Sequence, residues 1–504
     1  MKNFATKSLT FSAALLMSAC ATSGPTSTIV TSDTAPSSTY DAANPVLAER
    51  IAYAPVKTPA KNVILFIGDG MGISTVTAAR IFEGQQLGKQ GEEHQLSWET
   101  FPHTALSKTY NTNQQVPDSA GTATAMYTGV KTSAGVLGVA PDVQRGDCAA
   151  EEAGALRSFW DSASEAGLRL GLVSSARLTH ATPAAAYAHS SERNWEYDAA
   201  IPEDARTANC RDIAAQFVDR NIIDVAMGGG RRSFQRNTDV QADYPDEMGR
   251  RTDGVSLTDA WQDKNPGGKV VYDQAGFDSL VPGRDERVLG LFEPSHLKFS
   301  AANTGPDADP SLADMTARAI GLLSAKGGGY VLMVEGGRID HAHHGGNAFN
   351  ALSDTVAFAE AIAVADELTS DDDTTILVTA DHSHVFTIAG YPTRGNPILG
   401  LVKGNDDSGQ PSGEAVLADD DAPYTTLGYA NGPGAITGPR PMLTDSEVEA
   451  PLYQQQALVP GRSETHAGED VAIYAKGPRS YVVSGVVEQS YVHDAVLYAL
   501  DLER

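Results

Sequence analysis

Short, nearly continuous apolar segments recur along the chain and alternate with longer segments that have helical periodicity. The apolar segments are 62–68, 170–174, 222–227, 330–334, 375–379 and 471–475. Runs of this kind are typical of strands that are buried on both faces of a parallel sheet. The segments expected to be helical include 120–127, 156–166, 314–324 and 351–368. This alternation predicts an α/β fold with a large, mainly parallel central sheet and helices on both faces.

Acidic residues and histidines follow three of these apolar segments. They are Asp69 after 62–68, Glu335 and Asp340 after 330–334, and Asp381 and His382 after 375–379. The carboxyl ends of neighbouring parallel strands open on one crevice, where ligands bind. A single carboxylate at a strand end is usually a turn or a helix cap. Three such ends together, two of them with histidine, favour a common functional site.

The residue types at these ends are those of a metal centre without cysteine. Asp340 and His344 are four residues apart, so a helix or turn would let them share one ion. His466 comes just before segment 471–475. Mixed carboxylate and imidazole ligands suit catalytic Zn²⁺, whereas oxygen ligands alone suit Mg²⁺. Each histidine taken alone would be a surface or core residue, but their clustering favours metal binding.

Ser119 lies where a loop enters a predicted helix. Backbone N–H groups and the helix dipole at that position favour an anion or an alkoxide. The alternative is an ordinary N-cap serine. The chain has no GxSxG motif of a Ser-His-Asp triad, so the pattern favours activation of Ser119 by a metal cation.

Composition narrows the class of protein. The 504 residues are 41% hydrophobic and 20% charged, which is typical of a globular chain, and the formal net charge is −27. Such an acidic chain lacks the basic footprint that nucleic-acid binding needs. An anionic substrate would therefore be attracted by local charges or by bound cations.

The first residues have the pattern of an export signal. Lys2 and Lys7 precede an apolar run at 9–17 and the small residues Ser18 and Ala19, which predicts a signal peptide at 1–20. Cys20 resembles the lipidated cysteine of bacterial lipoproteins, with 21–45 as a flexible tether. This predicts a periplasmic protein that is anchored to the bacterial (outer) membrane only through lipid on Cys20. The alternative is a soluble secreted enzyme from which Cys20 is removed.

Two further cysteines remain in the mature chain. In an exported protein, Cys148 and Cys210 most simply form one disulfide, and two free thiols are the alternative. No CxxC motif is present, which argues against a cysteine metal site.

Five segments together resemble the alkaline phosphatases. They are 69–72, 118–123, 334–341, 379–384 and 464–470, in the order of that family. Segments 179–183 and 193–195 are more similar to the animal-type branch. The resemblance runs from about 62 to about 487 and implies one alkaline phosphatase domain over 46–504.

The resemblance implies a phosphomonoesterase with two zinc ions and one magnesium ion. Ser119 would become phosphoserine, Arg193 would clamp the phosphate, and His341 would contact it through water. One zinc would be bound by Asp340, His344 and His466, and the other by Asp381 and His382. Asp69 would bridge the second zinc and the magnesium, which Glu335 and Thr182 would complete, with His180 acting through a water.

Further parts of the family pattern are implied in the same way. Asp243, Phe292, Glu293 and Asp309 resemble a structural calcium site, with acidic surface loops as the alternative. Cys148 and Cys210 match a family disulfide. Segment 395–462, rich in Gly, Pro and Asp, resembles the crown insertion at a subunit interface and implies a homodimer; the alternative is a surface loop of a monomer.

Two other functions are compatible with parts of the pattern. Related phosphodiesterases and sulfatases share the metal ligands, but the former typically use Thr, and the latter need a C/S-x-P-x-R motif that Ser119 lacks. A phosphate- or metal-binding lipoprotein without turnover is the second alternative. The main expectation is hydrolysis of small phosphate monoesters.

Overall fold

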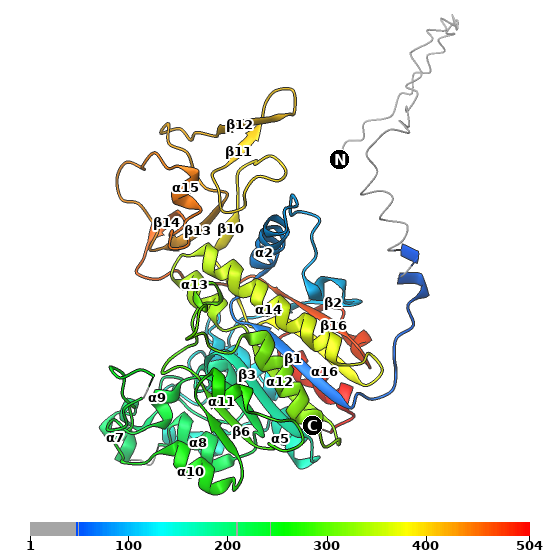
Figure 1. Cartoon of the computed structure of the whole chain (residues 1–504), viewed down its shortest axis with the longest axis vertical. Helices are drawn as coiled ribbons and strands as arrows, with labels where there is room; N and C mark the ends of the chain where they lie inside the picture. The colour runs from blue at the N-terminus through cyan, green and yellow to red at the C-terminus, as the bar shows by residue number, and fades with distance from the viewer. Residues whose placement is uncertain (1–46, 49, 208–209, 242, 504) are drawn as a thin grey trace, which may run out of the picture. The chain divides into compact units, whose positions relative to one another are not determined.

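A ten-stranded sheet forms the centre of the computed structural model, which describes residues 47–48, 50–207, 210–241 and 243–503 (Figure 1). The strand order is β17 (Gly485–Glu488), β2 (His103–Lys108), β16 (Val471–Lys476), β8 (Thr374–Ala380), β1 (Asn62–Gly68), β7 (Tyr330–Glu335), β3 (Arg169–Arg177), β4 (Val225–Gly229), β6 (Val288–Leu291) and β5 (Lys269–Val271). Only β16 among them runs antiparallel to its neighbours. The predicted large, mainly parallel sheet is therefore confirmed.

The continuous apolar runs arise because the middle of the sheet is covered on both faces. Val63, Leu65 and Ile67 of β1 belong to one buried cluster, whereas Ile64 and Phe66 belong to another. Successive side chains of a strand point to opposite faces, so both faces need apolar residues. Layers of helices supply the covering on each side.

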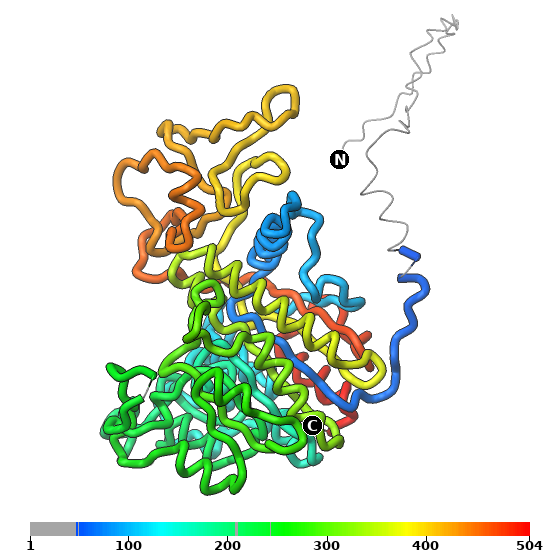
Figure 2. Tube along the Cα trace, in the orientation of Figure 1, coloured from blue at the N-terminus to red at the C-terminus, as the bar shows by residue number. Residues whose placement is uncertain are grey.

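One face is covered by three long helices, which are α2 (Ile73–Gln86), α12 (Leu312–Ser324) and α14 (Ala348–Leu368). The other face is covered by α3 (Ser119–Thr128), α5 (Phe159–Glu165), α8 (Ile213–Arg220), α10 (Leu257–Lys264) and α16 (Tyr491–Leu500). By length and composition α14 could cross a membrane, yet 56% of its most apolar window is buried inside this fold. Helices α12 and α14 lie side by side over the sheet, and Figure 2 shows the course of the chain along them.

Segment 395–462 lies apart from the central sheet and contains small elements of its own (Figure 1). They are β11 (Lys403–Asn405), β12 (Pro411–Ala415), β13 (Leu427–Gly432), α15 (Asp445–Val448) and β14 (Ala457–Pro460), and β10 (Phe386–Ile388) pairs with β13 just before them. This segment connects the end of β8 to β16 and so separates two groups of predicted site residues. Its role as a crown stays a prediction.

The signal peptide, Cys20 and the 21–45 tether lie outside the described residues. Residues Pro55–Arg504 form one compact unit, and all elements named here belong to it. Cys148 and Cys210 form a disulfide with a Cα–Cα distance of 5.5 Å, which confirms the predicted pairing.

Candidate active site

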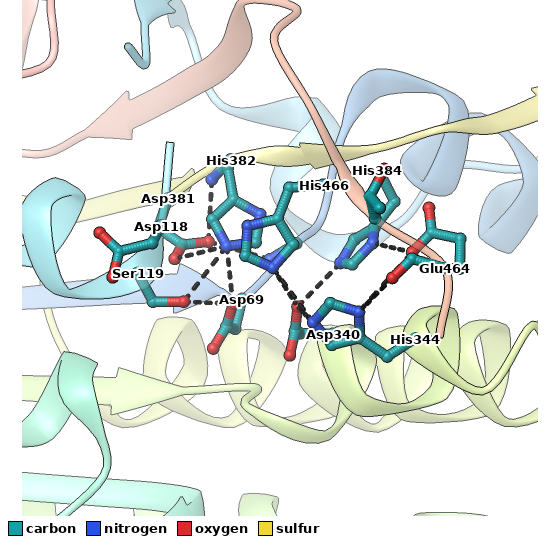
Figure 3. A network of polar contacts seen from close by, with 12 residues as sticks. Asp69, Asp118, Ser119, Asp340, His344, Asp381, His382, His384, Glu464 and His466 are labelled. Carbon is teal, nitrogen blue, oxygen red and sulfur yellow. Dashed lines mark hydrogen bonds and ion pairs between the residues drawn. The ribbon is translucent and has the colours of Figure 1, made fainter. Parts of the chain in front are cut away.

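Three neighbouring strands deliver carboxylates to one edge of the sheet, and Figure 3 shows two of these carboxylates, Asp69 and Asp381. Asp69 directly follows β1, Glu335 ends β7, and Asp381 directly follows β8, with β1 between the other two strands. All three side chains are fully buried. Gly70 follows Asp69 with a φ of +70°, and a Cβ there would lie 2.3 Å from Nε2 of His384. Only glycine fits this crowded turn.

A first group of potential ligands comes from a short helix and a two-residue strand. Asp340 and His344 lie one turn apart on α13 (Arg338–His344), and His466 lies in β15 (His466–Ala467). Oδ1 of Asp340 is 3.3 Å from Nε2 of both histidines, and the two Nε2 atoms are 3.1 Å apart. Ligand atoms about 2.0–2.1 Å from a tetrahedral ion lie about 3.3 Å from each other. The three side chains therefore fit a zinc-sized ion.

Hydrogen bonds on the far side of the rings orient these two histidines. Nδ1 of His344 donates to the carbonyl of Glu464 at 2.7 Å, and Nδ1 of His466 donates to the carbonyl of Pro117 at 2.8 Å. Donation from Nδ1 leaves the Nε2 lone pair free to face a metal ion.

A second group surrounds the hydroxyl of Ser119. Nε2 of His382 is 3.3 Å from Oδ2 of Asp381 and 3.5 Å from Oδ1 of Asp69. Oγ of Ser119 lies 3.2 Å from Nε2 of His382 and 3.5 Å from Oδ1 of Asp69. Backbone N–H groups of Gly70 and His382 hold the other oxygen of Asp381 at 2.9 and 2.8 Å. Ser119 thus occupies one corner of a second potential ion site.

A third group consists of buried oxygen atoms without hydrogen-bond partners among the described residues. They are Oδ2 of Asp69, Oε1 of Glu335 and Oγ1 of Thr182. The other oxygen of Glu335 accepts a hydrogen bond from the hydroxyl of Ser174. Asp69, Glu335 and His180 lie close enough together to share one ion. Oxygen atoms left unpaired in this way fit a hard cation such as Mg²⁺.

The buried carboxylates repel one another without a cation between them. Burial raises the pKa of Glu335 to about 8. Burial and the nearby carboxylate of Asp381 raise the pKa of Asp69 well above its usual range. Burial likewise raises the pKa of Asp381. Such concentrated negative charge is stable only when paired or bound to metal, so the electrostatics agree with the donor geometry.

Arg193 lies beside the nucleophile, held by a residue that the sequence analysis did not single out. Oδ1 of Asp118 accepts from the backbone N–H of Gly121 at 3.0 Å and caps α3, which begins at Ser119. Oδ2 of Asp118 is 3.0 Å from Nη1 of Arg193, and Nη2 is 3.3 Å from Nε2 of His180. The N-cap position directly before Ser119 is the sequence signal that could have identified Asp118.

His384 and Glu464 were also missed as site residues. Nε2 of His384 is 2.9 Å from Oδ1 of Asp340, and Nδ1 is 2.6 Å from Oε2 of Glu464. Burial opposes protonation of His384, but the two carboxylates raise its pKa to about 9. Both residues stand in motifs that carry predicted ligands, yet only the fold shows that they contact Asp340.

Three imidazoles lie together on the other side of Asp340. The ring of His341 is 3.9 Å from that of His296 and 5.4 Å from that of His180, measured between centroids. Burial lowers the pKa of His341 to about 3, so the ring is neutral. No motif in the sequence singled out His296, which follows β6.

The residues expected at a calcium site have cationic side chains as partners. Arg231 pairs with Asp243 at 2.7 Å and donates to the carbonyl of Phe292 at 2.8 Å. Nζ of Lys298 is 2.9 Å from Glu293 and 3.4 Å from Asp309. Asp243 therefore pairs with Arg231, whereas Glu293 and Asp309 pair with Lys298. Calcium binding at these residues stays a prediction.

Comparison with known proteins agrees with this geometry. The chain matches the family model described as alkaline phosphatase over residues 60–502. The tissue-nonspecific alkaline phosphatase of Gallus gallus is 46% identical over 451 residues, covering 87% of this chain and 84% of that protein. The isozyme of Homo sapiens is 45% identical, covering 87% and 83%.

A solved structure supports the fold independently of these sequences. The alkaline phosphatase of Thermus thermophilus aligns with a TM-score of 0.63 at 24% identity, covering 89% of this chain and 93% of that one. The family match spans the sheet and every residue of the three ligand groups. The chain belongs to the alkaline phosphatase family, whose members are metal-dependent phosphomonoesterases.

Proposed function

We propose that this enzyme hydrolyses small phosphate monoesters through a phosphoserine at Ser119. The single observation that carries the proposal is the position of Oγ of Ser119, 3.2 Å from Nε2 of His382 and 3.5 Å from Oδ1 of Asp69. The hydroxyl also lies at the N-terminus of α3, where backbone N–H groups favour negative charge.

The three ligand groups support two zinc ions and one magnesium ion. Asp340, His344 and His466 would hold one zinc, and Asp69, Asp381 and His382 the other. Asp69, Glu335 and Thr182 would hold magnesium, with His180 acting through a water. When bound, these cations supply charge stabilisation for the attacking and leaving oxygens of the transfer and a more acidic water for hydrolysis.

The residues of the chain then bind, orient and attack. The guanidinium of Arg193, anchored by Asp118, holds two phosphate oxygens in its planar fork. Oγ of Ser119 forms a bond to phosphorus as the bond to the alcohol oxygen breaks, and the alcohol leaves with a proton. Water then attacks the phosphoserine, which releases phosphate and restores the Ser119 hydroxyl. His341 would contact the phosphate through water.

A Ser119→Ala variant tests this chemistry against the alternative of binding without turnover. We expect hydrolysis of p-nitrophenyl phosphate by the zinc- and magnesium-loaded protein to fall by about a thousandfold or more, because the nucleophile is lost. Binding of inorganic phosphate should persist, since Arg193 remains. Unchanged hydrolysis by the variant would rule out Ser119 as the nucleophile.

The same assay distinguishes a monoesterase from a diesterase. The motif after Ser119 is Ala-Gly-Thr, which favours monoesters over the related phosphodiester and sulfate chemistry. We expect p-nitrophenyl phosphate to react far faster than bis(p-nitrophenyl) phosphate and p-nitrophenyl sulfate. A preference for the diester or the sulfate would contradict the proposal.

Export and assembly complete the proposal. Segment 395–462 exposes large apolar side chains, including Leu452 at 85% and Leu458 at 83%, which supports a crown-like interface in a homodimer. Light scattering after gel filtration measures the dimer.

Fractionation of cells that carry Cys20→Ser tests whether lipid on Cys20 anchors the protein in the periplasm.

A further inference from the structure

Three arginines gather beyond the histidines that flank the metal centre. They are Arg177 at the end of β3, Arg232 in α9 (Arg231–Phe234), and Arg250, here called the arginine cluster. The backbone N–H of Arg250 donates to the carbonyl of Arg232 at 2.8 Å. Burial, Arg250 and Arg177 together lower the pKa of Arg232, so the three charges lie close enough to repel one another.

Within the described residues, Glu196 is the one carboxylate that forms an ion pair with this cluster, and its partner is Arg177. Glu196 accepts from Nε and Nη2 of Arg177 at 2.7 and 2.6 Å and from the hydroxyl of Thr179 at 2.5 Å. This bidentate pair neutralises Arg177. The other two arginines keep their positive charges.

Neither remaining arginine forms an ion pair in the described part of the chain. Arg250 is exposed, and its side chain donates to the hydroxyl of Tyr197 at 3.3 Å, a neutral group. Arg232 is half-buried, and its Nε is fully buried without an acceptor among the described residues. A buried donor without a partner costs free energy unless a ligand or water supplies the acceptor. Two arginines without an ion pair among the described residues also stand out in a chain of net charge −27.

Contacts connect the cluster to the phosphate pocket. The backbone N–H of Arg177 donates to Nδ1 of His296 at 3.3 Å, and the side chain of Arg177 also contacts that ring. His296 packs on His341, which follows the metal ligand Asp340. Arginine and imidazole side chains therefore extend from the cluster toward the centre.

We propose that Arg232 and Arg250, beside the neutralised Arg177, form a second anion-binding site that takes a phosphate group. Guanidinium donors match the spacing of phosphate oxygens, and the acceptor that Arg232 lacks is what such a group supplies. The phosphate is either inorganic phosphate, which the reaction releases, or a second phosphate on a substrate held at Arg193. The site lies outside the residues assigned to the metals and to catalysis.

Phosphate binding to the metal-loaded enzyme tests the site directly. In isothermal titration with inorganic phosphate, we expect two binding sites per chain in the parent protein. Arg232→Gln/Arg250→Gln should weaken the second by at least tenfold and leave the first unchanged, because Arg193 is intact. Arg236→Gln is the matched control, since Arg236 is nearby but already paired with Asp239 at 3.0 Å.

Kinetics distinguish the two sources of phosphate. If a substrate's second phosphate binds here, the double variant should lose about tenfold in kcat/KM for a sugar bisphosphate and nothing for p-nitrophenyl phosphate. If free phosphate binds, only the titration changes; both results support the site. Unchanged p-nitrophenyl phosphate kinetics also show that the proposed phosphatase function stands whether or not this site does.

The proposal is overturned if the double variant keeps the parent's phosphate isotherm and both kcat/KM values. Should the double variant unfold, Arg250→Gln decides alone, because Arg250 is exposed and its loss leaves the core intact. A weaker second phosphate site, or a lower kcat/KM for the sugar bisphosphate, in Arg250→Gln supports the proposal, and an unchanged isotherm together with unchanged kcat/KM values refutes it.

Discussion

Burying several carboxylates close together in the metal centre costs free energy, and bound cations offset that cost. Asp69 shows this most clearly, because one oxygen faces Ser119 and His382 while the other is buried without a partner among the described residues. A carboxylate placed between two ligand groups can serve both ions at once. The structure thus gives Asp69 a position in two of the three ligand groups.

Replacing Asp69 with Ala should disturb two ions together. We expect zinc and magnesium contents both to fall and kcat/KM for p-nitrophenyl phosphate to drop by a hundredfold or more, which exceeds the usual effect of losing an outer-shell partner. Elemental analysis after gel filtration measures the metals. Asp239→Ala removes a half-buried carboxylate that lies outside the three ligand groups and pairs with Arg236, so both metals should be retained. Full metal content in Asp69→Ala would contradict the bridging position.

The pH dependence of the metal-free protein follows from two shifted groups. Burial raises the pKa of Glu335 to about 8, and neighbouring carboxylates raise that of His384, despite its burial, to about 9. Between pH 6.5 and 8 the folded chain holds both protons and the unfolded chain does not, so stability falls as pH rises. Each group lowers the free energy of unfolding by about 1.4 kcal/mol for each pH unit in this window.

Urea unfolding of chelator-treated protein at several pH values in this window checks the sign. Below pH 6.5 the slope should become shallower, because Glu335 still holds its proton only in the folded chain, whereas burial lowers the pKa of His382 and His343, which gain protons only on unfolding. The metal-loaded protein should lose less stability, since bound cations keep Glu335 ionised. A metal-free stability that rises from pH 6.5 to 8 would show that these buried groups are not protonated as described.

At the scale of elements, α14 contributes a large part of one apolar layer. The ring of Phe358 meets Phe66 of β1 at 5.7 Å and Trp98 at 5.8 Å, both edge to face. Phe358 is fully buried, and it connects the helix to the strand that precedes Asp69. The packing therefore supports both the fold and the position of the site.

Phe358→Ala should lower the free energy of unfolding by about 3–5 kcal/mol, because it removes a buried ring and leaves a cavity. Leu368→Ala at the exposed end of α14 is the control and should change stability by about 0.5 kcal/mol or less. Denaturant unfolding of the metal-loaded variants measures both. Equal effects would mean that α14 does not pack on the sheet in solution.

At the scale of the whole molecule, a disulfide closes a long loop of the chain that contains Arg193. Cys148 and Cys210 are 62 residues apart, and the backbone between them carries Arg193. Gly135, on a neighbouring loop, accepts a hydrogen bond from the backbone N–H of Arg193 at 2.9 Å. Closing a loop of this length restricts the unfolded chain.

Cys148→Ser/Cys210→Ser should destabilise the fold by about 2–5 kcal/mol through the freedom returned to the unfolded chain. The melting temperature of the metal-loaded double variant, compared with the parent, measures this. Reduction of the parent should give the same shift. A double variant as stable as the parent would show that the bridge adds nothing to the fold.

The sequence predicted the middle of the sheet well and its edges poorly. Segment 62–68 coincides with β1, whereas β4 begins at Val225, three residues after the predicted start. The strands β17 and β2 at one side of the sheet were not predicted, because their residues alternate between buried and exposed or lie mostly at the surface. Burial on both faces leaves a continuous apolar run in the longer central strands, whereas the short strand β6 was missed although all of its residues are buried.

What the sequence by itself determined is the set of chemical groups and the strand ends that carry them. Asp69, Glu335 and Asp381 were predictable because each follows a strand whose burial on both faces demands a continuous apolar run. The tertiary structure alone decided which groups meet, since contacts such as His384 with Glu464 or His296 with His341 join segments far apart in the chain. The order of strands in the sheet sets those distances, and local sequence carries little record of that order.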